Sequence, residues 1–386
     1  MRRTQVAIIG AGPAGLALGH LLHVQGIDSV ILENRSREYV EARIRAGVLE
    51  QGVVELFEQM GVADRLHREG IVHEGIELQF AGERHRLDFA DLTGRHIVVY
   101  GQTEVVKDLI TARHATGRPL LFEADDVSVH DLDTDRPRVR YVHEGDTVDL
   151  ECDVIAGCDG FHGVCRPSIP DSVLRTFSRE YPYGWLGILA AVAPSNDELI
   201  YAHHDRGFAL LSLRSPELSR LYVQVPPDED IGAWSDDRIW AELQTRLGVD
   251  GWTLAEGPVL EKGVTPMRSF VTEPMRHGRL FLAGDAAHIV PPTGAKGLNL
   301  AINDVRILAE ALAAWYGKGH EALLDAYSAN CLQRVWRAEH FSWWMTTMLH
   351  LHPEGDSFDG RLQLSQLRYV TSSRAAAQSL AENYVG

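Results

Sequence analysis

A glycine-rich turn near the N-terminus has the residue types and spacing of a dinucleotide site. Gly10, Gly12 and Gly15 form a G-x-G-x-x-G pattern that follows the apolar run 6–9 and opens a helical pattern. The first glycine permits a tight turn, the second lets a pyrophosphate approach the backbone, and the third lets helix and strand pack closely. Glu33 ends the next apolar run, where its carboxylate can accept hydrogen bonds from a ribose diol. The pattern predicts bound FAD or NAD without choosing between them.

A later segment has the chemistry to bind an aromatic carboxylate. If it forms a strand, the period of two puts Phe208, Leu210, Ser212 and Arg214 on one face. An apolar stripe that ends in a hydroxyl and a guanidinium suits an aromatic ring whose carboxylate pairs with arginine. Tyr222 in the following strand-like segment could add a second hydroxyl. An arginine at the solvent-exposed end of a strand is the alternative interpretation.

Two further segments each place a glycine and an aspartate after a strand. They are 158–163, CDGFHG, and 278–288, GRLFLAGDAAH. Together with the N-terminal glycines they resemble the three fingerprints of the FAD-dependent aromatic hydroxylases, the single-component class A flavoprotein monooxygenases. Segments 100–104, 289–299 and 382–386 are similar to the members that hydroxylate 4-hydroxybenzoate, and the resemblance covers essentially the whole chain.

The resemblance implies a reaction and gives several side chains a role in it. FAD would be reduced by NADH or NADPH and would react with O2, and 4-hydroxybenzoate would become 3,4-dihydroxybenzoate. Tyr201 would hold the substrate phenol, Tyr384 would extend a proton relay, and His73 would release the proton to solvent. Pro292 would present its carbonyl near the substrate hydroxyl. The substrate carboxylate would be held by Ser212, Arg214 and Tyr222. A packed aromatic or a surface histidine is the alternative interpretation of the relay residues.

The resemblance also implies which residues bind the cofactors. Asp285, at a strand end, can hold a ribityl hydroxyl, although a simple helix N-cap is the alternative. A helix beginning near Leu298 and Asn299 would direct N–H groups and a positive dipole end at the flavin. The other expected FAD contacts are Gly10, Gly12, Gly15, Glu33, Arg43, Arg45, Gln102 and Asp159. The expected NAD(P)H contacts are Asn34, Arg35, Tyr39, Arg45, His162 and Arg268.

The sequence departs from the family pattern at two places. Ala14 stands where these enzymes commonly carry a serine in the glycine motif, so we expect one hydroxyl contact to the pyrophosphate to be missing. Asn34 follows Glu33 where the NADPH-dependent members place an arginine, which changes the charge available to a 2′-phosphate. We therefore expect NADH to be used at least as well as NADPH.

The elements that must position these residues are predicted from apolar periodicity. Strand, turn, helix and strand follow one another in the first forty residues, a helical pattern covers 39–66, strand-like segments cover 181–225, and the chain from Leu298 onward is mainly helical. The expected fold is mixed α/β: a Rossmann-like, glutathione-reductase-type FAD domain, an antiparallel-sheet substrate domain and C-terminal helices. The expected bounds are 1–73, 97–180 and 269–297 for the FAD domain, 74–96 and 181–268 for the substrate domain, and 298–386 for the helical region.

Composition excludes several classes of function. Of 386 residues, 54 are acidic and 37 basic, which gives a net charge of −17 and disfavours binding to nucleic acid. The 4 cysteines match no zinc or redox motif, so we expect no metal site. The apolar run 185–193 is too short to span a membrane, and a cytoplasmic protein is expected.

Oligomeric state and some functional alternatives stay open at this point. The aromatic segment that contains Trp336, Trp343 and Trp344 could be core or interface, and the resemblance implies a homodimer. A related hydroxylase acting on 3-hydroxybenzoate, salicylate or another phenol is the nearest alternative function. A non-catalytic FAD-binding, redox-responsive protein and an NAD-only dehydrogenase are the alternatives from other classes.

Overall fold

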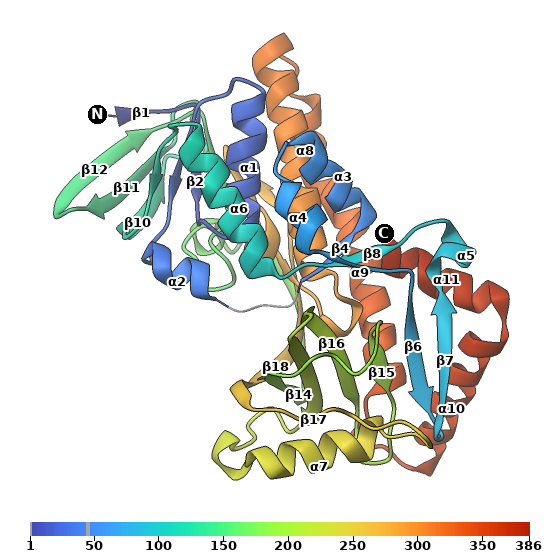
Figure 1. Ribbon diagram of the computed structural model, residues 1–386. Coiled ribbons are helices and arrows are strands. Elements are labelled where there is room, and N and C mark those ends of the chain that lie inside the picture. The colour runs from blue at the N-terminus through green and yellow to red at the C-terminus, as the bar shows by residue number, and fades with distance from the viewer. Residues whose placement is uncertain (1, 44–46) are drawn as a thin grey trace.

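The N-terminal glycine motif belongs to a mostly parallel sheet in the computed structural model, which describes residues 2–43 and 47–386 (Figure 1). Neighbouring strands are parallel except for the pair β19 and β20. Every residue of β2 and β13 is buried, as expected for strands with helices on both faces. In spatial order the strands are β19 (Arg276–His277), β20 (Leu280–Leu282), β13 (Val154–Gly157), β2 (Val6–Ile9), β3 (Ser29–Leu32) and β9 (Leu120–Leu121).

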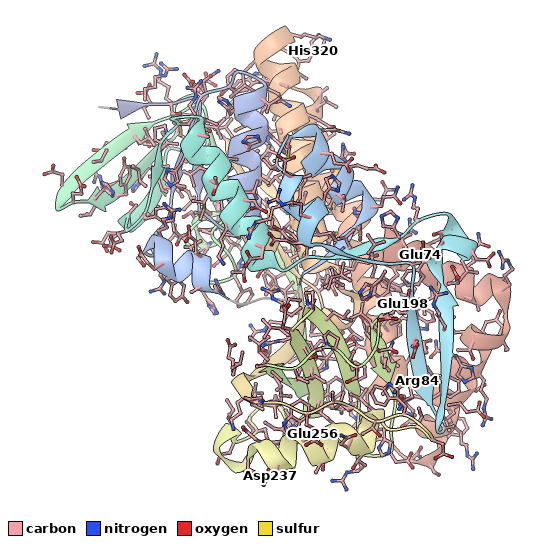
Figure 2. All side chains as sticks on the ribbon, viewed as in Figure 1. Glu74, Arg84, Glu198, Asp237, Glu256 and His320 are labelled. Carbon is pink, nitrogen blue, oxygen red and sulfur yellow. The ribbon has the colours of Figure 1, made fainter. Side chains whose placement is uncertain are left out.

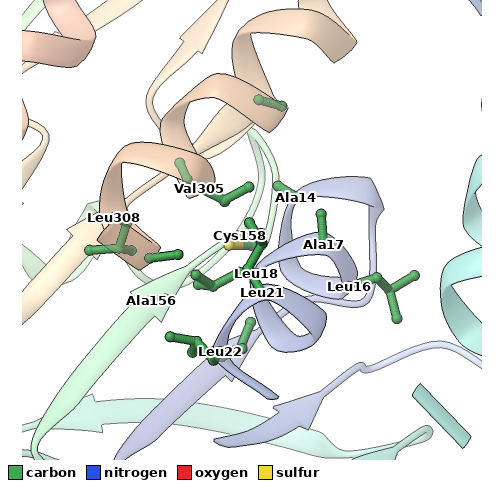
Figure 3. Close-up of a cluster of buried hydrophobic side chains, with 14 of the residues drawn as sticks. Ala14, Leu16, Ala17, Leu18, Leu21, Leu22, Ala156, Cys158, Val305 and Leu308 are labelled. Atoms are coloured by element: carbon green, nitrogen blue, oxygen red, sulfur yellow. The ribbon is translucent and has the colours of Figure 1, made fainter. Parts of the chain in front are cut away.

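Helices α1 (Pro13–Val24) and α8 (Gly297–Lys318) pack against each other and against this sheet. Figure 3 shows their apolar side chains meeting over β13, with Leu18 of α1 and Val305 of α8 in the same cluster. α6 (Gln102–Ala115) contacts α1 from another side. The packing holds the first turns of α1 and α8 next to the carboxyl ends of the parallel strands, which is where ligands bind in open α/β sheets.

A second, mostly antiparallel sheet carries the segment with Ser212 and Arg214. Its strands in spatial order are β21 (His288–Ile289), β18 (Val259–Glu273), β14 (Arg175–Ala190), β17 (Leu218–Val225), β16 (Ala209–Ser215), β15 (Ile200–Ala202), β6 (Gly75–Phe80) and β7 (Glu83–Asp88). One face packs on α7 (Asp236–Leu247) and the other on α9 (Ala322–Leu349), α10 (Ser357–Ser372) and α11 (Arg374–Val385). Figure 1 shows α7 on one side of this sheet and α9, α10 and α11 on the other.

Two small sheets, four short helices and four 3-10 turns make up the rest of the described fold. One small sheet joins β4 (Val48–Glu50), β8 (Ile97–Val99) and β5 (Ile71–His73). Another joins β1 (Arg2–Arg3), β12 (Asp146–Glu151), β11 (Arg138–His143) and β10 (Asp125–His130). The remaining helices are α2 (Arg37–Ala42), α3 (Gln51–Gln59), α4 (Asp64–Glu69), α5 (Phe89–Thr93) and the 3-10 turns η1 (Arg166–Ser168), η2 (Ile231–Ala233), η3 (Gly284–Ala286) and η4 (Pro292–Gly294).

The predicted fold class is confirmed, with two differences in detail. The helical pattern expected over 39–66 is interrupted by β4, because Val48–Glu50 pairs with β8. The boundaries expected at 180 and 268 fall inside β14 and β18, which pair on both sides of those positions with a register shift between Glu180 and Gly184. The division into three parts stays a prediction.

Candidate active site

The glycine turn leaves space for a pyrophosphate. Gly10 has φ +103°, and a Cβ there would lie 2.3 Å from the carbonyl oxygen of Cys158, so only glycine fits. Gly12 caps α1 without any side-chain hydrogen bond, and a Cβ at Gly12 would have no atom within 4 Å. The chain therefore has open space beside Gly12, at the positive end of the helix dipole and before the uncapped first turn of α1, an arrangement that suits a phosphate.

Glu33 connects the ends of β2 and β3. Its carboxylate accepts hydrogen bonds from the backbone N–H of Ala11 at 2.8 Å and of Arg35 at 2.9 Å. Each oxygen keeps a second lone pair, so the carboxylate can still accept from a ribose diol.

The start of α8 offers a second set of free N–H groups. No side chain caps this helix, and a Cβ at Gly297 would have no atom within 4 Å. Asp285 in η3 is exposed nearby in sequence, whereas the Asn299 side chain is fully engaged: it accepts from the N–H of Glu50 and donates to the carbonyls of Val48 and Ala295. Any contact of Asn299 with the flavin would therefore come from its backbone. Together the two uncapped helix starts fit the pyrophosphate and the flavin of FAD.

Three other residues expected to contact FAD differ in burial and in hydrogen bonding. Asp159 is turned towards its own loop, where its carboxylate accepts from the N–H of Cys165 at 2.8 Å and burial raises its pKa. Gln102 is half-buried at the first turn of α6, and Arg43 is exposed. Arg45 lies outside the described residues.

The residues expected to bind NAD(P)H form two groups. Asn34, Arg35 and Tyr39 are exposed after β3, and the Arg35 guanidinium lies 5.3 Å from the centre of the Tyr39 ring. His162 and Arg268 instead meet at Phe161: the rings of Phe161 and His162 are 5.0 Å apart, and the Arg268 guanidinium lies 4.9 Å from the Phe161 ring. The second group shows how residues distant in sequence come together around one aromatic ring.

Tyr201 and Tyr384 form the phenol end of the candidate site. Their hydroxyl oxygens are 2.5 Å apart, and the side chains are 2% and 1% exposed. Burial raises the pKa of both phenols, so each stays protonated and can pass a proton by accepting one and releasing another. The two tyrosines come from β15 and α11, and they are 183 positions apart.

A buried ion pair beside Tyr384 was not recognised from the sequence. Lys296 donates to Glu50 at 2.6 Å and to the carbonyl of Tyr384 at 2.8 Å, and Arg334 pairs with the other oxygen of Glu50. Burial lowers the pKa of Lys296, and the Glu50 carboxylate opposes that effect. A lysine within the stretch PPTGAKG was the available signal, because such a charge is rarely buried without a partner.

His73 is completely buried, and no protein atom of the described chain is hydrogen-bonded to either ring nitrogen. Burial lowers its pKa to about 4, against the opposing charges of Glu198 and Asp197. Its neighbours Val72 and Glu74 line a cavity of about 540 Å³ together with Glu198 and Asp197. Figure 2 shows Glu74 and Glu198 beside β6. The structure places His73 next to this acidic cavity but records no contact between His73 and Tyr384.

The residues expected to bind the substrate carboxylate lie on the same sheet as Tyr201. Tyr201, Leu210 and Tyr222 are direct partners across β15, β16 and β17, so the two tyrosines are roughly 10 Å apart along the sheet. Arg214 donates to the hydroxyl of Thr103 at 3.2 Å, and burial lowers its pKa. The guanidinium packs on Gly101, where a Cβ would lie 2.1 Å from Nη1. A planar molecule with a phenol at one end and a carboxylate at the other matches this row.

Two more residues expected to contact the substrate, Ser212 and Pro292, have different surroundings. Ser212 pairs with Arg220 across β17, and the Arg220 guanidinium is 3.3 Å from the Tyr222 hydroxyl, a contact that sequence reasoning missed. Pro292 is exposed at the start of η4, and Ala295 after it has φ +54°, which turns the chain into α8.

The family follows from comparison with known proteins. Residues 3–342 match the family model described as FAD binding domain. The chain belongs to this family. Its members include the class A FAD-dependent hydroxylases, and the chain is an FAD-dependent monooxygenase of that class.

Relatives with assigned names support the membership. A relative named p-hydroxybenzoate hydroxylase, from Acinetobacter baylyi, is 53% identical over 386 residues, which are 100% of this chain and 95% of the relative. A probable NADH-specific resorcinol 4-hydroxylase from Rhodococcus jostii is 26% identical over 85% of this chain and 62% of its own length. The crystal structure of p-nitrophenol 4-monooxygenase PnpA from Pseudomonas putida DLL-E4 superposes with a TM-score of 0.85 at 19% identity, covering 100% and 99% of the two chains; it shows the fold.

Two further features of the described residues bear on other classes of function. Within 2–43 and 47–386, no helix has the length and apolar character needed to cross a membrane. In the same part of the chain, no cluster of His, Cys, Asp and Glu side chains could hold a metal ion.

Proposed function

We propose that the protein hydroxylates 4-hydroxybenzoate to 3,4-dihydroxybenzoate, using FAD, O2 and NADH or NADPH. The row Tyr201, Leu210 and Tyr222, with Arg214 at one end and Tyr384 at the other, carries the proposal. The relative named p-hydroxybenzoate hydroxylase supports it at 53% identity.

In this proposal one set of side chains binds the substrate carboxylate and another transfers the phenol proton. Arg214, Ser212 and Tyr222 would hold the substrate carboxylate, which fixes the direction of the ring in the pocket. Tyr201 would accept the phenol proton and pass its own to Tyr384, so that the ring becomes electron-rich. When bound along the starts of α1 and α8, FAD supplies the electrons taken from the nicotinamide and activates O2.

The test is the rate of flavin reduction. Stopped-flow mixing of the FAD-loaded protein with NADH or NADPH should show faster reduction with 4-hydroxybenzoate than with 3-hydroxybenzoate or salicylate, and 3,4-dihydroxybenzoate should be the product. Faster reduction with another phenol, or no hydroxylated product, would contradict the proposal.

We propose that NADH serves at least as well as NADPH. Asn34 and the exposed Arg35 follow Glu33, and Arg35 is partly engaged with the Tyr39 ring. A 2′-phosphate therefore meets less positive charge than the arginine-bearing pattern would provide. Comparing kcat/KM for the two cofactors decides the point, and a strong preference for NADPH would contradict it.

We propose a homodimer in the cytoplasm. Phe177, Trp336 and Trp343 are 44%, 41% and 37% exposed and line one cavity of about 340 Å³, which is a large apolar surface to leave in water. Sedimentation should give a dimer, and Trp336→Glu should shift it towards monomer.

The cysteines support the proposed location in the cytoplasm. The described cysteines are free and buried, which is compatible with a reducing compartment.

A further inference from the structure

The C-terminal end of α9 holds a histidine whose ring has a fixed protonation pattern. His350 is 1% exposed, and its Nδ1 lies 2.9 Å from the carbonyl of Thr346 while its Nε2 accepts from the Trp185 indole N–H at 2.7 Å. A carbonyl only accepts and an indole N–H only donates, so Nδ1 carries the proton and Nε2 carries the lone pair. Burial lowers the pKa of His350 to about 3, which keeps this neutral form at ordinary pH.

The Trp185 indole, which donates to His350, packs against Tyr222 at the proposed carboxylate end of the candidate site. The Trp185 ring stacks on Phe208 with 5.3 Å between centroids and lies 4.8 Å from the ring of Tyr222. His350 itself stacks on Phe208 at 4.3 Å and on Tyr183 at 5.0 Å. Rotating the indole would therefore displace its neighbours, Tyr222 among them.

The same turn of α9 also contacts the loop that contains Pro292. The hydroxyl of Thr346 donates to the hydroxyl of Thr293 at 2.8 Å, and both side chains are completely buried. The carbonyl of Thr346 accepts from the His350 ring. A single helical turn is thus bonded to the Pro292 loop on one side and, through His350, to Trp185 on the other.

We propose that His350 is a positioning residue for the substrate: through its hydrogen bond to Trp185 it fixes Tyr222 at the carboxylate end. This inference rests on the proposed function, because it assumes that Tyr222 contacts the substrate carboxylate. His350 acts through Trp185 and need not touch the substrate.

Removing the acceptor separates this role from simple packing. His350→Phe keeps an aromatic ring in the stack but leaves the indole N–H buried without a partner, which is costly enough to reorient the ring. His350→Gln places an amide oxygen where it can accept from the same N–H. Trp185→Phe removes the donor, and the double variant His350→Phe/Trp185→Phe removes both groups. His352→Phe, at an exposed histidine on the same segment, is the matched control.

The experiment measures substrate affinity in the FAD-loaded enzyme. Titration with 4-hydroxybenzoate, followed by the absorbance of the flavin, should give a Kd about tenfold higher for His350→Phe and for Trp185→Phe, the effect of one unpaired buried group. KM should rise similarly while kcat changes less than about twofold. His350→Gln should recover most of the affinity, and His352→Phe should match the unmodified protein. The two single effects should not add in the double variant, because both break one bond.

A ligand without the carboxylate separates positioning from loss of structure. The affinity for 4-cresol should change less than that for 4-hydroxybenzoate, because Tyr222 lies at the carboxylate end. An unchanged Kd in His350→Phe overturns the inference, and so does an equal loss for both ligands accompanied by a lower Tm. If His350→Phe does not fold, Trp185→Phe gives the same test from the donor side. Failure of the unmodified protein to bind 4-hydroxybenzoate overturns the proposed function first, before any variant is compared.

Discussion

At the scale of single residues, the candidate site depends on contacts between side chains that are far apart in the chain. Tyr201 and Tyr384 share a hydrogen bond across 183 positions, and Lys296 reaches both Glu50 and the Tyr384 carbonyl. The first of these contacts places two buried hydroxyls in series. The chemistry of each residue can be stated from its type, but the proton path exists only once the residues meet.

Replacing Tyr201 with phenylalanine should slow hydroxylation and leave substrate affinity nearly unchanged. The variant keeps the ring but loses the hydroxyl that receives the phenol proton, and such proton transfer typically contributes about 100-fold or more to the rate. Product formation per turnover and kcat measure the loss. Tyr141→Phe, at a buried tyrosine in β11 of another sheet, is the control. A Tyr201→Phe variant with the rate of the unmodified protein would exclude Tyr201 from the proton path.

Replacing Arg214 with lysine should weaken binding of 4-hydroxybenzoate by about tenfold to a hundredfold. Lysine keeps a positive charge but cannot make a bidentate pair with the carboxylate. It would also lose the planar contact with Gly101. Titration of the flavin spectrum gives the Kd, and Arg206→Lys at an exposed salt bridge serves as control. Equal affinities would place the carboxylate elsewhere.

At the scale of elements, the parallel sheet and its helices bring the glycine turn, Glu33 and the start of α8 together. Glycine spacing and the acid after β3 predicted the order strand, turn, helix and strand, whereas the role of the α8 start was expected only from the family resemblance. The small sheet of β4, β8 and β5 was missed, because three-residue strands carry almost no periodicity. Asn299 was predicted as a flavin contact from its motif, yet its side chain is bonded to Glu50, Val48 and Ala295, partners that no local pattern reveals.

The connection between α6 and the sheet should depend on Arg113. This fully buried guanidinium donates to the carbonyls of Gly19, Ser29 and Pro119, which belong to α1, β3 and the segment before β9. Arg113→Met would remove these buried hydrogen bonds from a charged donor and should lower the free energy of unfolding by about 3 kcal/mol.

Urea unfolding measures the effect of Arg113→Met. Arg118→Met, which removes an exposed pair with Asp28, should cost less than about 1 kcal/mol and is the comparison. Similar losses for the two variants would mean that the buried carbonyls find other partners.

At the scale of the whole molecule, the net charge says little about the charges at the candidate site. The net charge is −17, yet the half-buried Arg214 and the buried Lys296 both lie at that site. Composition alone was sufficient to disfavour nucleic acid, but it could not reveal which charges are buried, and the described chain buries basic and acidic side chains alike: Arg113, Arg246, Lys296, Glu50, Asp304 and Glu339. That distribution depends on burial, which only the folded chain defines.

Stability should depend on pH through Glu339. Burial raises its pKa to about 7 from 4.5, so the folded protein keeps a proton that the unfolded chain releases, and stability falls as pH rises from about 4.5 to 7. Glu339→Gln removes this loss. Its stabilising effect should be small near pH 4.5 and reach at most about 3 kcal/mol above pH 7.

Urea unfolding of both proteins at pH 5 and pH 8 provides the measurement for Glu339. Glu354→Gln, at an exposed position, should show no such dependence. If Glu339→Gln gave the same change in unfolding free energy at both pH values, the carboxyl would be charged in the folded protein across this range.

The order of strands in the parallel sheet has a consequence for how the chain folds. β2 is bordered by β3 on one side and by β13 on the other, and β13 in turn needs β20 near residue 280. During synthesis β2 and β3 therefore emerge long before β13 exists, and the edge of β2 stays unpaired while about 145 further residues are added, from position 9 to 154, at about 5–20 residues per second. Such distant pairing makes folding slow and exposes the nascent chain to aggregation. The edge of β2 is therefore the part of the nascent chain most open to wrong strand pairing until β13 covers it.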